Sequence, residues 1–448
     1  MTRVIRGSDR SPARVVLASD RGLQFSDDYL EGWKWGFTTI GCEVVEIDIQ
    51  RLRRYGSAGS VPSILSMRGT DPKELARQVS AHKPDLIFCH HGRAASNPAF
   101  LKIVRSAGIP TAVYLCDEPY ESGATALYSP EFDYVFTMDP CTVEAHRLSR
   151  ANRANVFYLP PGVQTQHFNW RSYENRSTPA FFLGNASLIP RPAWLAPIER
   201  MVDGARILYK RSIFKGRNTD QWIPYSKHPQ LYGDAVVGLN VHRSPTITRE
   251  CYVRRVKNRD PRMRVPHGIK LCSSMPKHEG TGFWNEGNLP AAHVNPRFLE
   301  MAACGTLVVS DDHRSELARM FPCAPRAQDP DHFLELVLHY LEHQDEAAEI
   351  GRICSYLISR RHSYRHRAAE VLIRVGLRGK LKDEMFSSLG EPEVWLSPQD
   401  LNSPEASSSS ERTGPSERWS PRSGLSWIET FGRRSEAGSL DAPAPWLL

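Results

Sequence analysis

Two neighbouring strand-like segments end in side chains that can move protons. The apolar run DLIFCHHG (85–92) ends in His90 and His91, and TAVYLCDEP (111–119) ends in Asp117 and Glu118. Imidazole and carboxylate groups are common general acids and bases. We therefore treat these four residues as candidate catalytic groups. The alternative is that each of them caps a helix or orders a loop.

A second constellation lies near residue 300 and suits an anion. In HVNPRFLEMAACGTLVVS (293–310), Asn295 is a predicted helix N-cap followed by proline, and Gly305 ends the helix before a buried strand. Arg297 and Glu300 then lie about 60° apart on one helix face, near the end whose free N–H groups attract anions. The alternative for Glu300 is an ion pair with Arg297 on an exposed face.

Further cations could bind an anionic ligand. Arg191 follows the strand-like run AFFLGN (180–185), and Lys227 and Arg243 are the other candidates. Gly184 would let the backbone approach a phosphate. Each cation could instead be an ordinary surface residue.

The sequence has no spacing typical of a bound metal. Its nine cysteines form no C-x-x-C or C…H pattern, which indicates reduced thiols and a cytoplasmic setting. Asp311 and Asp312 resemble an Asp-x-Asp metal pair but lack its spacing, and we predict that they cap a helix beginning near Arg314. We expect no metal.

The elements that must position these groups alternate along the chain. Strand-like runs occur at 13–19, 42–49, 85–92, 111–119, 132–139, 155–163, 180–185, 205–210, 234–243 and 306–310, with amphipathic segments between most of them. This pattern predicts an α/β fold with two doubly wound parallel sheets, in which ligands bind beyond the carboxyl ends of the strands.

The expected domains follow from breaks in this pattern. They are a loose leader (1–12), a first domain (13–168), a second domain (178–375) with a basic stretch (244–282), a terminal helix or crossover (376–395) and a Ser/Pro-rich tail (396–448) predicted to be disordered. A length of 448 residues agrees with two or three domains. No secretory signal or transmembrane run is present in the sequence.

The net charge of the chain does not identify its binding partner. The net charge of +7 permits anionic ligands or a loose membrane-surface contact. The basic stretch could bind nucleic acid or anionic lipid, line the acceptor or phosphate side of a cleft, or be a solvated loop; its cations are Arg249, Arg254, Arg255, Lys257, Arg259, Arg262 and Arg264. We expect no nucleic-acid partner.

Three segments, in order, resemble a known family. PPGVQTQHF (160–168), NPRFLEMAACGTLVVS (295–310) and HSYRHRA (362–368), together with FLGN and Arg191, are similar to the GT-B glycosyltransferases of family 4 and the CgeB-like (spore maturation protein) group. The matching residues of the first two segments are Pro161, Gly162, Val163, Phe168, Asn295, Arg297, Phe298, Glu300, Cys304 and Gly305.

The resemblance implies two Rossmann-like domains facing a cleft and transfer of a sugar from a UDP- or GDP-linked donor. Glu300 would hydrogen-bond the donor ribose, with the nucleotide sugar as co-substrate and no further cofactor. The acceptor would be a glycan, a lipid-linked or a protein substrate, as in cell-surface glycan biosynthesis, in the cytoplasm or at the inner membrane face.

One position departs from the family. Many family 4 enzymes carry a glutamate eight residues before the position of Glu300, where this chain has Ala292. This departure favours a rival, a non-catalytic protein of the same fold that binds nucleotide sugars or acts as a scaffold. A nucleotide-sugar epimerase is a third alternative.

Overall fold

The computed structural model describes residues 11–19, 24–48, 71–91, 98–120, 122–148, 155–184, 190–209, 223–245, 285, 289–390, 392 and 396–397. The predicted leader, basic stretch and Ser/Pro-rich tail lie outside these residues, except at their edges. The chain divides into two compact units, and each is described by itself.

The first unit contains a six-stranded parallel sheet in the order β2-β1-β3-β4-β5-β6. Its strands are β1 (Arg14–Ser19), β2 (Glu43–Asp48), β3 (Leu86–His90), β4 (Thr111–Leu115), β5 (Tyr134–Thr137) and β6 (Val156–Tyr158). Every residue of β3 and β4 is buried, as expected for parallel strands covered on both faces.

Helices precede or follow these strands in the doubly wound manner. They are α1 (Gln24–Thr39), α2 (Pro72–Ala81), α3 (Pro98–Ser106), α4 (Ser122–Tyr128) and α5 (Val143–Leu148), followed much later in the chain by α13 (Tyr364–Arg374) and α14 (Asp383–Ser387). Short 3-10 turns lie at Ser129–Glu131, Pro140–Thr142 and Arg378–Lys380.

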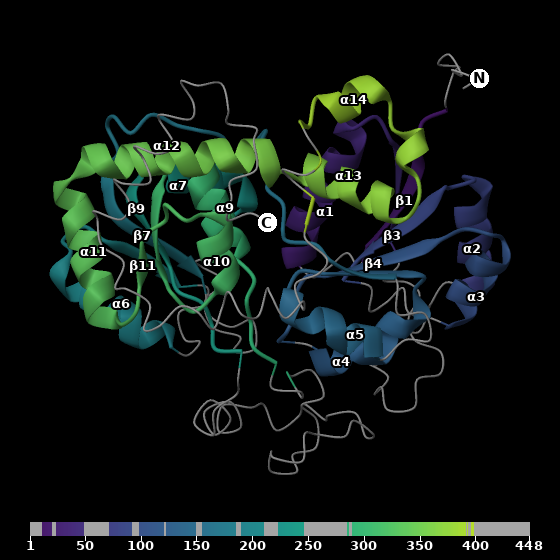
Figure 1. Cartoon of the computed structure of the whole chain (residues 1–448), viewed down its shortest axis with the longest axis horizontal. Helices are drawn as coiled ribbons and strands as arrows, with labels where there is room; N and C mark the ends of the chain where they lie inside the picture. Colours follow the sequence, from purple (N-terminus) through teal and green to yellow (C-terminus); the bar gives the residue numbers. More distant parts are fainter. Residues whose placement is uncertain are drawn as a thin grey trace, which may run out of the picture. The chain divides into compact units, whose positions relative to one another are not determined.

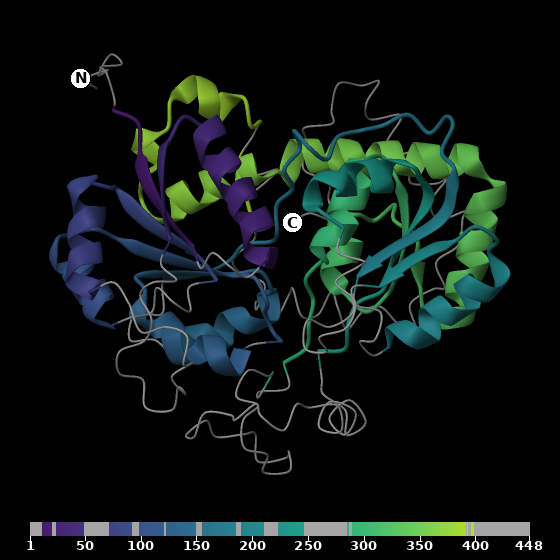
Figure 2. The ribbon, with the colours of Figure 1, turned by 180° about the vertical axis from the view of Figure 1, so that it is seen from behind.

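Helix α13 packs against α1, although more than 300 residues of sequence separate them. Gly32 and Gly36 lie one helical turn apart on α1 and make room for Tyr364, because a Cβ atom on Gly36 would lie 2.4 Å from the Tyr364 carbonyl oxygen. The Tyr364 ring meets Trp33 edge-on, with the ring centroids 5.3 Å apart. The pair of helices is visible in purple and yellow-green in Figures 1 and 2.

This packing moves a domain boundary. The described residues up to Leu159 cluster with Asn285, Leu289 and residues 364–390, whereas 160–245 and 290–363 form the second unit. Residues 364–375, expected in the second domain, therefore cluster with the first unit. The periodicity of these residues predicts an apolar helix face but does not indicate which unit buries that face.

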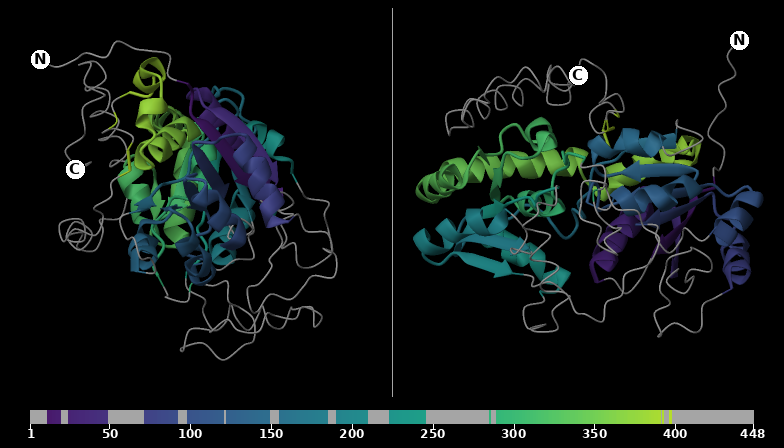
Figure 3. Two further views of the ribbon diagram at one scale, coloured as in Figure 1. Left: turned by 90° about the vertical axis from the view of Figure 1, so that its right-hand side faces the viewer. Right: turned by 90° about the horizontal axis from the view of Figure 1, so that it is seen from below.

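The second unit contains a five-stranded parallel sheet in the order β11-β10-β9-β7-β8. Its strands are β7 (Thr178–Gly184), β8 (Arg206–Tyr209), β9 (Ala235–Asn240), β10 (Leu307–Asp311) and β11 (Arg326–Ala327). Its helices are α6 (Arg191–Met201), α7 (His228–Gly233), α9 (Pro296–Ala303), α10 (Ser315–Met320), α11 (Pro330–Glu342) and α12 (Gln344–Arg361), with a 3-10 turn at Tyr225–Lys227. Helix α11 packs on α6, and α9 packs on α7 and α12. The further views in Figure 3 show the teal strands of this sheet with the green helices along it.

The two sheets share one strand order, and the order locates their ligand edges. In each, the first strand lies between the second and the third, so the chain reverses direction across the sheet between β1 and β3 and between β7 and β9. Loops that leave such a switch point part from each other and open a crevice at the carboxyl edge. The α/β fold class with two parallel sheets is thereby confirmed. Among the described residues, no helix has the length and apolar character needed to cross a membrane.

Candidate functional site

Arg191 lies at the switch point of the second sheet. Its side chain is buried, with 5% exposed, and its Nε–H donates to the carbonyl oxygen of Val241 at 2.7 Å. Gly184 ends β7 beside it, and a Cβ at Gly184 would lie 3.0 Å from the Phe182 ring and 3.7 Å from Arg191 Nη1. Glycine at this position therefore leaves room for the Phe182 ring, while the guanidinium lies at an ordinary van der Waals distance beside the end of the strand.

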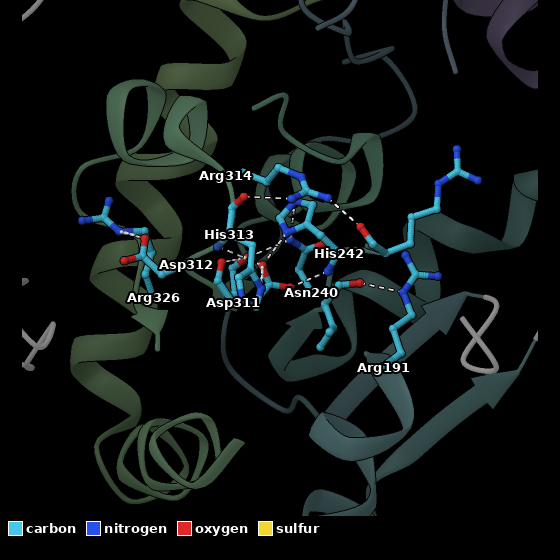
Figure 4. A network of polar contacts seen from close by, with 11 residues as sticks. Arg191, Asn240, His242, Asp311, Asp312, His313, Arg314 and Arg326 are labelled. Carbon is cyan, nitrogen blue, oxygen red and sulfur yellow. Dashed lines mark hydrogen bonds and ion pairs between the residues drawn. The ribbon is translucent and has the colours of Figure 1, made fainter. Parts of the chain in front are cut away.

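A second buried arginine holds the same loop from its other side. Arg314 is 3% exposed, and its Nη2–H donates to the carbonyl oxygen of Arg243 at 2.7 Å. Between the two arginine-bound carbonyls, the backbone N–H of His242 donates to the carboxylate of Asp311. The loop after β9 is thus bound at three successive residues, and Figure 4 shows these side chains converging on it.

Asp311 is the centre of this network. Its carboxylate is fully buried and accepts hydrogen bonds from His242 Nδ1 at 2.8 Å and from the backbone N–H of His313 at 3.2 Å, and it pairs with His313 Nδ1 at 3.2 Å. Burial opposes its ionisation, but its interactions with His242 and His313 outweigh burial, so its pKa lies below the ordinary value.

The expectation that Asp311 and Asp312 cap a helix near Arg314 was wrong. Helix α10 begins at Ser315, and its N-cap residue, Arg314, makes no side-chain capping bond. The Asp311 carboxylate turns inward to the loop after β9, and Asp312 pairs with Arg326 at 3.3 Å. A local capping rule could not predict the contact between Asp311 and His242, because His242 lies 69 residues earlier in the sequence.

The hydrogen bonds assign one tautomer to His242. Its Nδ1 carries the proton donated to Asp311, and its Nε2 lies 3.4 Å from the side-chain amide nitrogen of Asn240, which can donate to it. Burial lowers the pKa of His242 to about 4, against the opposing effect of Asp311. The imidazole is therefore neutral and serves to orient the loop.

Helix α9 has the predicted start and end. The Asn295 side chain accepts from the backbone N–H of Arg297 at 2.9 Å, Pro296 occupies the first turn, and Gly305 has φ of +77°. Glycine adopts this left-handed conformation without strain. The strand that follows, β10, is buried along its whole length.

Glu300 lies on α9 and is 6% exposed, so the alternative of an ion pair with Arg297 on an exposed face does not apply. Its Oε1 accepts from the Tyr225 hydroxyl at 3.1 Å and its Oε2 from the Tyr232 hydroxyl at 3.3 Å. Burial, followed by the charge of Glu300, raises the pKa of Tyr232. Ala292, before the helix, is also buried, and its carbonyl oxygen accepts from the Glu316 backbone N–H at 3.1 Å.

Lys227 belongs to a different feature. Its side chain lines an open hollow of about 570 Å³ together with Arg171, Gln230 and five other residues. The backbone N–H of Arg171 donates to the carbonyl oxygen of Cys304 at 3.2 Å, and Cys304 is the C-cap residue of α9. The hollow therefore lies toward the opposite end of α9 from Asn295, and the structure does not group Lys227 with Arg191.

The first unit brings two of its four candidates together. His91 follows β3 and Asp117 follows the neighbouring β4, and His91 Nε2 lies 3.5 Å from Asp117 Oδ2. The His91 side chain is 15% exposed and that of Asp117 45% exposed, so solvent reaches both. Such a pair at a carboxyl edge can bind or deprotonate a polar ligand.

His90 and Glu118 are enclosed instead. His90 is 2% exposed between the rings of Tyr29 and Tyr114, and burial lowers its pKa to about 3. Glu118 is fully buried, where its carboxylate accepts from the hydroxyl of Thr125. Of the four candidates, these two have the surroundings of structural residues.

Sequence reasoning missed the residues that hold the site. Arg314, His242 and the tyrosines on Glu300 were not among the candidates. A signal was present, because the strand-like run DAVVGLNVHR (234–243) ends in polar residues and the predicted buried strand TLVVS (306–310) is followed by Asp311. Their adjacency in the sheet supplies the rest.

Comparison with known proteins gives one family match. Residues 284–373, which include α9, β10 and α12, match the family described as "Glycosyl transferase-like". No curated protein matches the chain.

Solved structures give remote similarities. A sucrose-phosphate synthase from Thermosynechococcus elongatus has 10% identity and a TM-score of 0.46 over 84% of this chain and 100% of that one. The Anabaena protein HepE in complex with UDP and glucose has 10% identity and a TM-score of 0.45 over 81% of this chain and 99% of that one. The glycosyltransferase SnogD from Streptomyces nogalater has 13% identity and a TM-score of 0.38 over 81% and 99%.

Because these TM-scores are below 0.5, the structural similarities carry no argument. The likeness to glycosyl transferases depends on the family match, and the fold class depends on the two parallel sheets. The part of the second unit that contains α9 and Glu300 lies within the stretch that matches the glycosyl transferase-like family.

Proposed function

We propose that this chain is a glycosyltransferase that takes a sugar from a UDP- or GDP-linked donor bound by the second unit. The observation that carries the proposal is the glycosyl transferase-like match over residues 284–373, which includes the capped helix α9. The acceptor is a glycan, a lipid-linked or a protein substrate. The proposal includes membership of the narrower CgeB-like group, which the sequence resembles.

The diphosphate of the donor would lie beyond the switch point of the second sheet. Arg191 and Arg314 are buried there, and the half-buried Arg243 extends from the loop they hold. Fixed positive charge is what a departing nucleoside diphosphate needs, because its own charge grows as the bond to the sugar breaks. Since three bonds already fix the loop, little reorganisation is needed on binding.

The donor ribose would interact with Glu300. Its carboxylate already accepts hydroxyl protons from Tyr225 and Tyr232, so it is oriented to accept hydroxyl donors. Tyr225 is half-buried and comes from a turn next to α7, so a ribose hydroxyl can take the place of its hydroxyl group. On the acceptor side, His91 and Asp117 are the solvent-reached pair.

Donor binding is tested first by a thermal-shift screen against UDP-, GDP- and ADP-sugars, because a ligand of the native state raises its stability. Calorimetry on Glu300→Gln then tests the ribose contact. We expect at least about a tenfold loss of affinity for the nucleotide, which corresponds to about 1.4 kcal/mol.

Glu316→Gln is the matched control. Glu316 is also a buried glutamate of the second unit, but its carboxylate binds Arg319 at 2.5 and 2.9 Å. Its replacement should leave nucleotide affinity unchanged. Equal affinity of Glu300→Gln and the wild-type chain would contradict the proposed ribose contact.

A rival function is favoured by one observation. Ala292 places a small buried side chain where many family 4 enzymes have a glutamate. A non-catalytic relative would bind the donor but neither hydrolyse nor transfer its sugar. A nucleotide-sugar epimerase would interconvert the donor in the absence of any acceptor, so a donor panel with product analysis separates all three.

A further inference from the structure

Three side chains with metal-ligand chemistry meet at the carboxyl edge of the first sheet. His91 lies directly after β3, and Cys116 and Asp117 lie directly after the adjacent β4. One ligand atom from each lies within 4.8 Å of the other two. We propose that His91, Cys116 and Asp117 bind a zinc ion.

The separations suit a tetrahedral ion. Metal–ligand bonds of about 2.0–2.3 Å place neighbouring ligand atoms about 3.3–3.8 Å apart. His91 Nε2 and Asp117 Oδ2 are already 3.5 Å apart. The remaining pairs, at no more than 4.8 Å, need to close by at most about 1.0–1.5 Å, a shift that side-chain rotations can provide.

The backbone already holds His91 toward its neighbours. The His91 N–H donates to the Tyr114 carbonyl oxygen at 2.9 Å, and the Tyr128 hydroxyl donates to the His91 carbonyl oxygen at 2.7 Å. With φ of +67°, His91 is one of three described residues other than glycine with positive φ. This unfavourable conformation is kept where two strands end side by side and where the His91 imidazole lies 3.5 Å from the Asp117 carboxylate.

The ligand set selects the ion. A thiolate and an imidazole favour zinc over magnesium or calcium, which prefer oxygen ligands alone. The thiolate and carboxylate together carry two negative charges, which balance Zn²⁺. Three protein ligands leave a fourth position for water, and the 45% exposure of Asp117 keeps that position within reach of solvent.

The proposal goes beyond the proposed function, because donor binding involves the second unit and can be measured without zinc. The tag-free, full-length chain would be stripped with chelator, loaded with ZnSO₄ and desalted, and its zinc measured by mass spectrometry. We expect one equivalent. Co²⁺ in place of zinc should give a thiolate charge-transfer absorption band.

Variants locate the ion. Cys116→Ser and His91→Asn should each weaken zinc binding at least about tenfold, since changes even to residues that merely orient a metal ligand cost about 10- to 100-fold. Asparagine is chosen at position 91 because it tolerates positive φ. Cys141→Ser, which removes another half-buried thiol of the same unit, should bind zinc as the wild-type chain does.

Circular dichroism would establish that each variant is folded. Less than one equivalent of zinc in the wild-type chain would overturn the proposal. Wild-type affinity in Cys116→Ser or in His91→Asn, or equal weakening in Cys141→Ser, would overturn it as well.

Discussion

The two sheets share a strand order, but their carboxyl edges differ in chemistry. In the second unit, the edge has two buried arginines and a loop that a buried carboxylate fixes. In the first unit, the edge presents an imidazole, a thiol and a carboxylate that solvent partly reaches. One topology can therefore serve an anion in one unit and a cation or a polar acceptor in the other, because ligand choice depends on the few residues that follow the strands.

The largest expected effect is on the loop-fixing carboxylate. Asp311→Asn puts a neutral amide where His242 and His313 both donate to a buried charged group, and we expect a loss of about 3 kcal/mol in the free energy of unfolding, since hydrogen bonds to charged groups contribute about 1.5–3 kcal/mol. Urea denaturation measures it. Asp312→Asn is the adjacent control, with a side chain 31% exposed and one ion pair. A similar loss of unfolding free energy in both variants would contradict the conclusion that the buried contacts of Asp311 stabilise the loop after β9.

Charge at the second edge gives the next effect. Arg191→Gln removes a buried guanidinium, and we expect nucleotide affinity to fall by about 2 kcal/mol, or roughly 30-fold. Calorimetry with the nucleotide identified by the thermal-shift screen measures this. Asp117→Asn, at the first edge, should leave the same affinity unchanged. If it lowers affinity as much as Arg191→Gln, the assignment of nucleotide binding to the second unit fails.

Acid sensitivity should also differ between variants of the two units. Burial lowers the pKa of His90 to about 3. Between pH 6.5 and 3, His90 is therefore protonated in the unfolded chain but neutral in the native chain. Stability from this residue is therefore present above pH 6.5 and is lost as the pH falls. For His313 the sign is opposite, because hydrogen bonding to Asp311 raises its pKa.

His90→Phe tests this difference. Phenylalanine keeps the contacts with the rings of Tyr29 and Tyr114 but cannot be protonated. We expect the fall in unfolding free energy from pH 7 to pH 5 to be smaller in the variant by at most about 2 kcal/mol. Urea melts at the two pH values would show it, and an unchanged fall would mean that His90 is protonated in the native chain.

The smallest effects compare helix caps. Asp71 caps α2 in the first unit and Asn295 caps α9 in the second, each accepting from the N–H two residues on, at 3.0 and 2.9 Å. Replacement by alanine should cost about 1 kcal/mol in either case. Only Asn295→Ala should also weaken nucleotide binding, by calorimetry. Equal weakening by Asp71→Ala would remove the functional distinction between the caps.

Local signals in the sequence were sufficient for much of the fold. Asn295, Pro296 and Gly305 fix the limits of α9 through rules that act within a turn, so that helix and its strand were predicted closely. The two-residue strand β11 was missed because so short a segment has no periodicity. The alternation of strands with helices predicted two parallel sheets, which the strand order confirms.

The site could be predicted only in part, because its contacts join distant residues. Arg191 was found by its place after a strand, but its bond to Val241 depends on which strands are neighbours. His242, in the loop after β9, and Asp311, at the end of the adjacent β10, are 69 residues apart in the sequence. For Cys116 the sequence predicted only a reduced thiol, since nothing near it in the sequence showed that His91 would lie across from it.

The contact between α1 and α13 has a consequence for the order of synthesis. A ribosome makes α1 first, but the partner of Gly32 and Gly36 begins at Tyr364, after all the strands of the second unit. During synthesis, the face of α1 that contains Gly32 and Gly36 therefore remains uncovered until the second sheet has been translated. For the same reason, a gene fragment that stops at Leu159 encodes an unfinished unit, and recombination can transfer the first unit intact only if it also carries the separate piece of the gene that encodes residues 364–390.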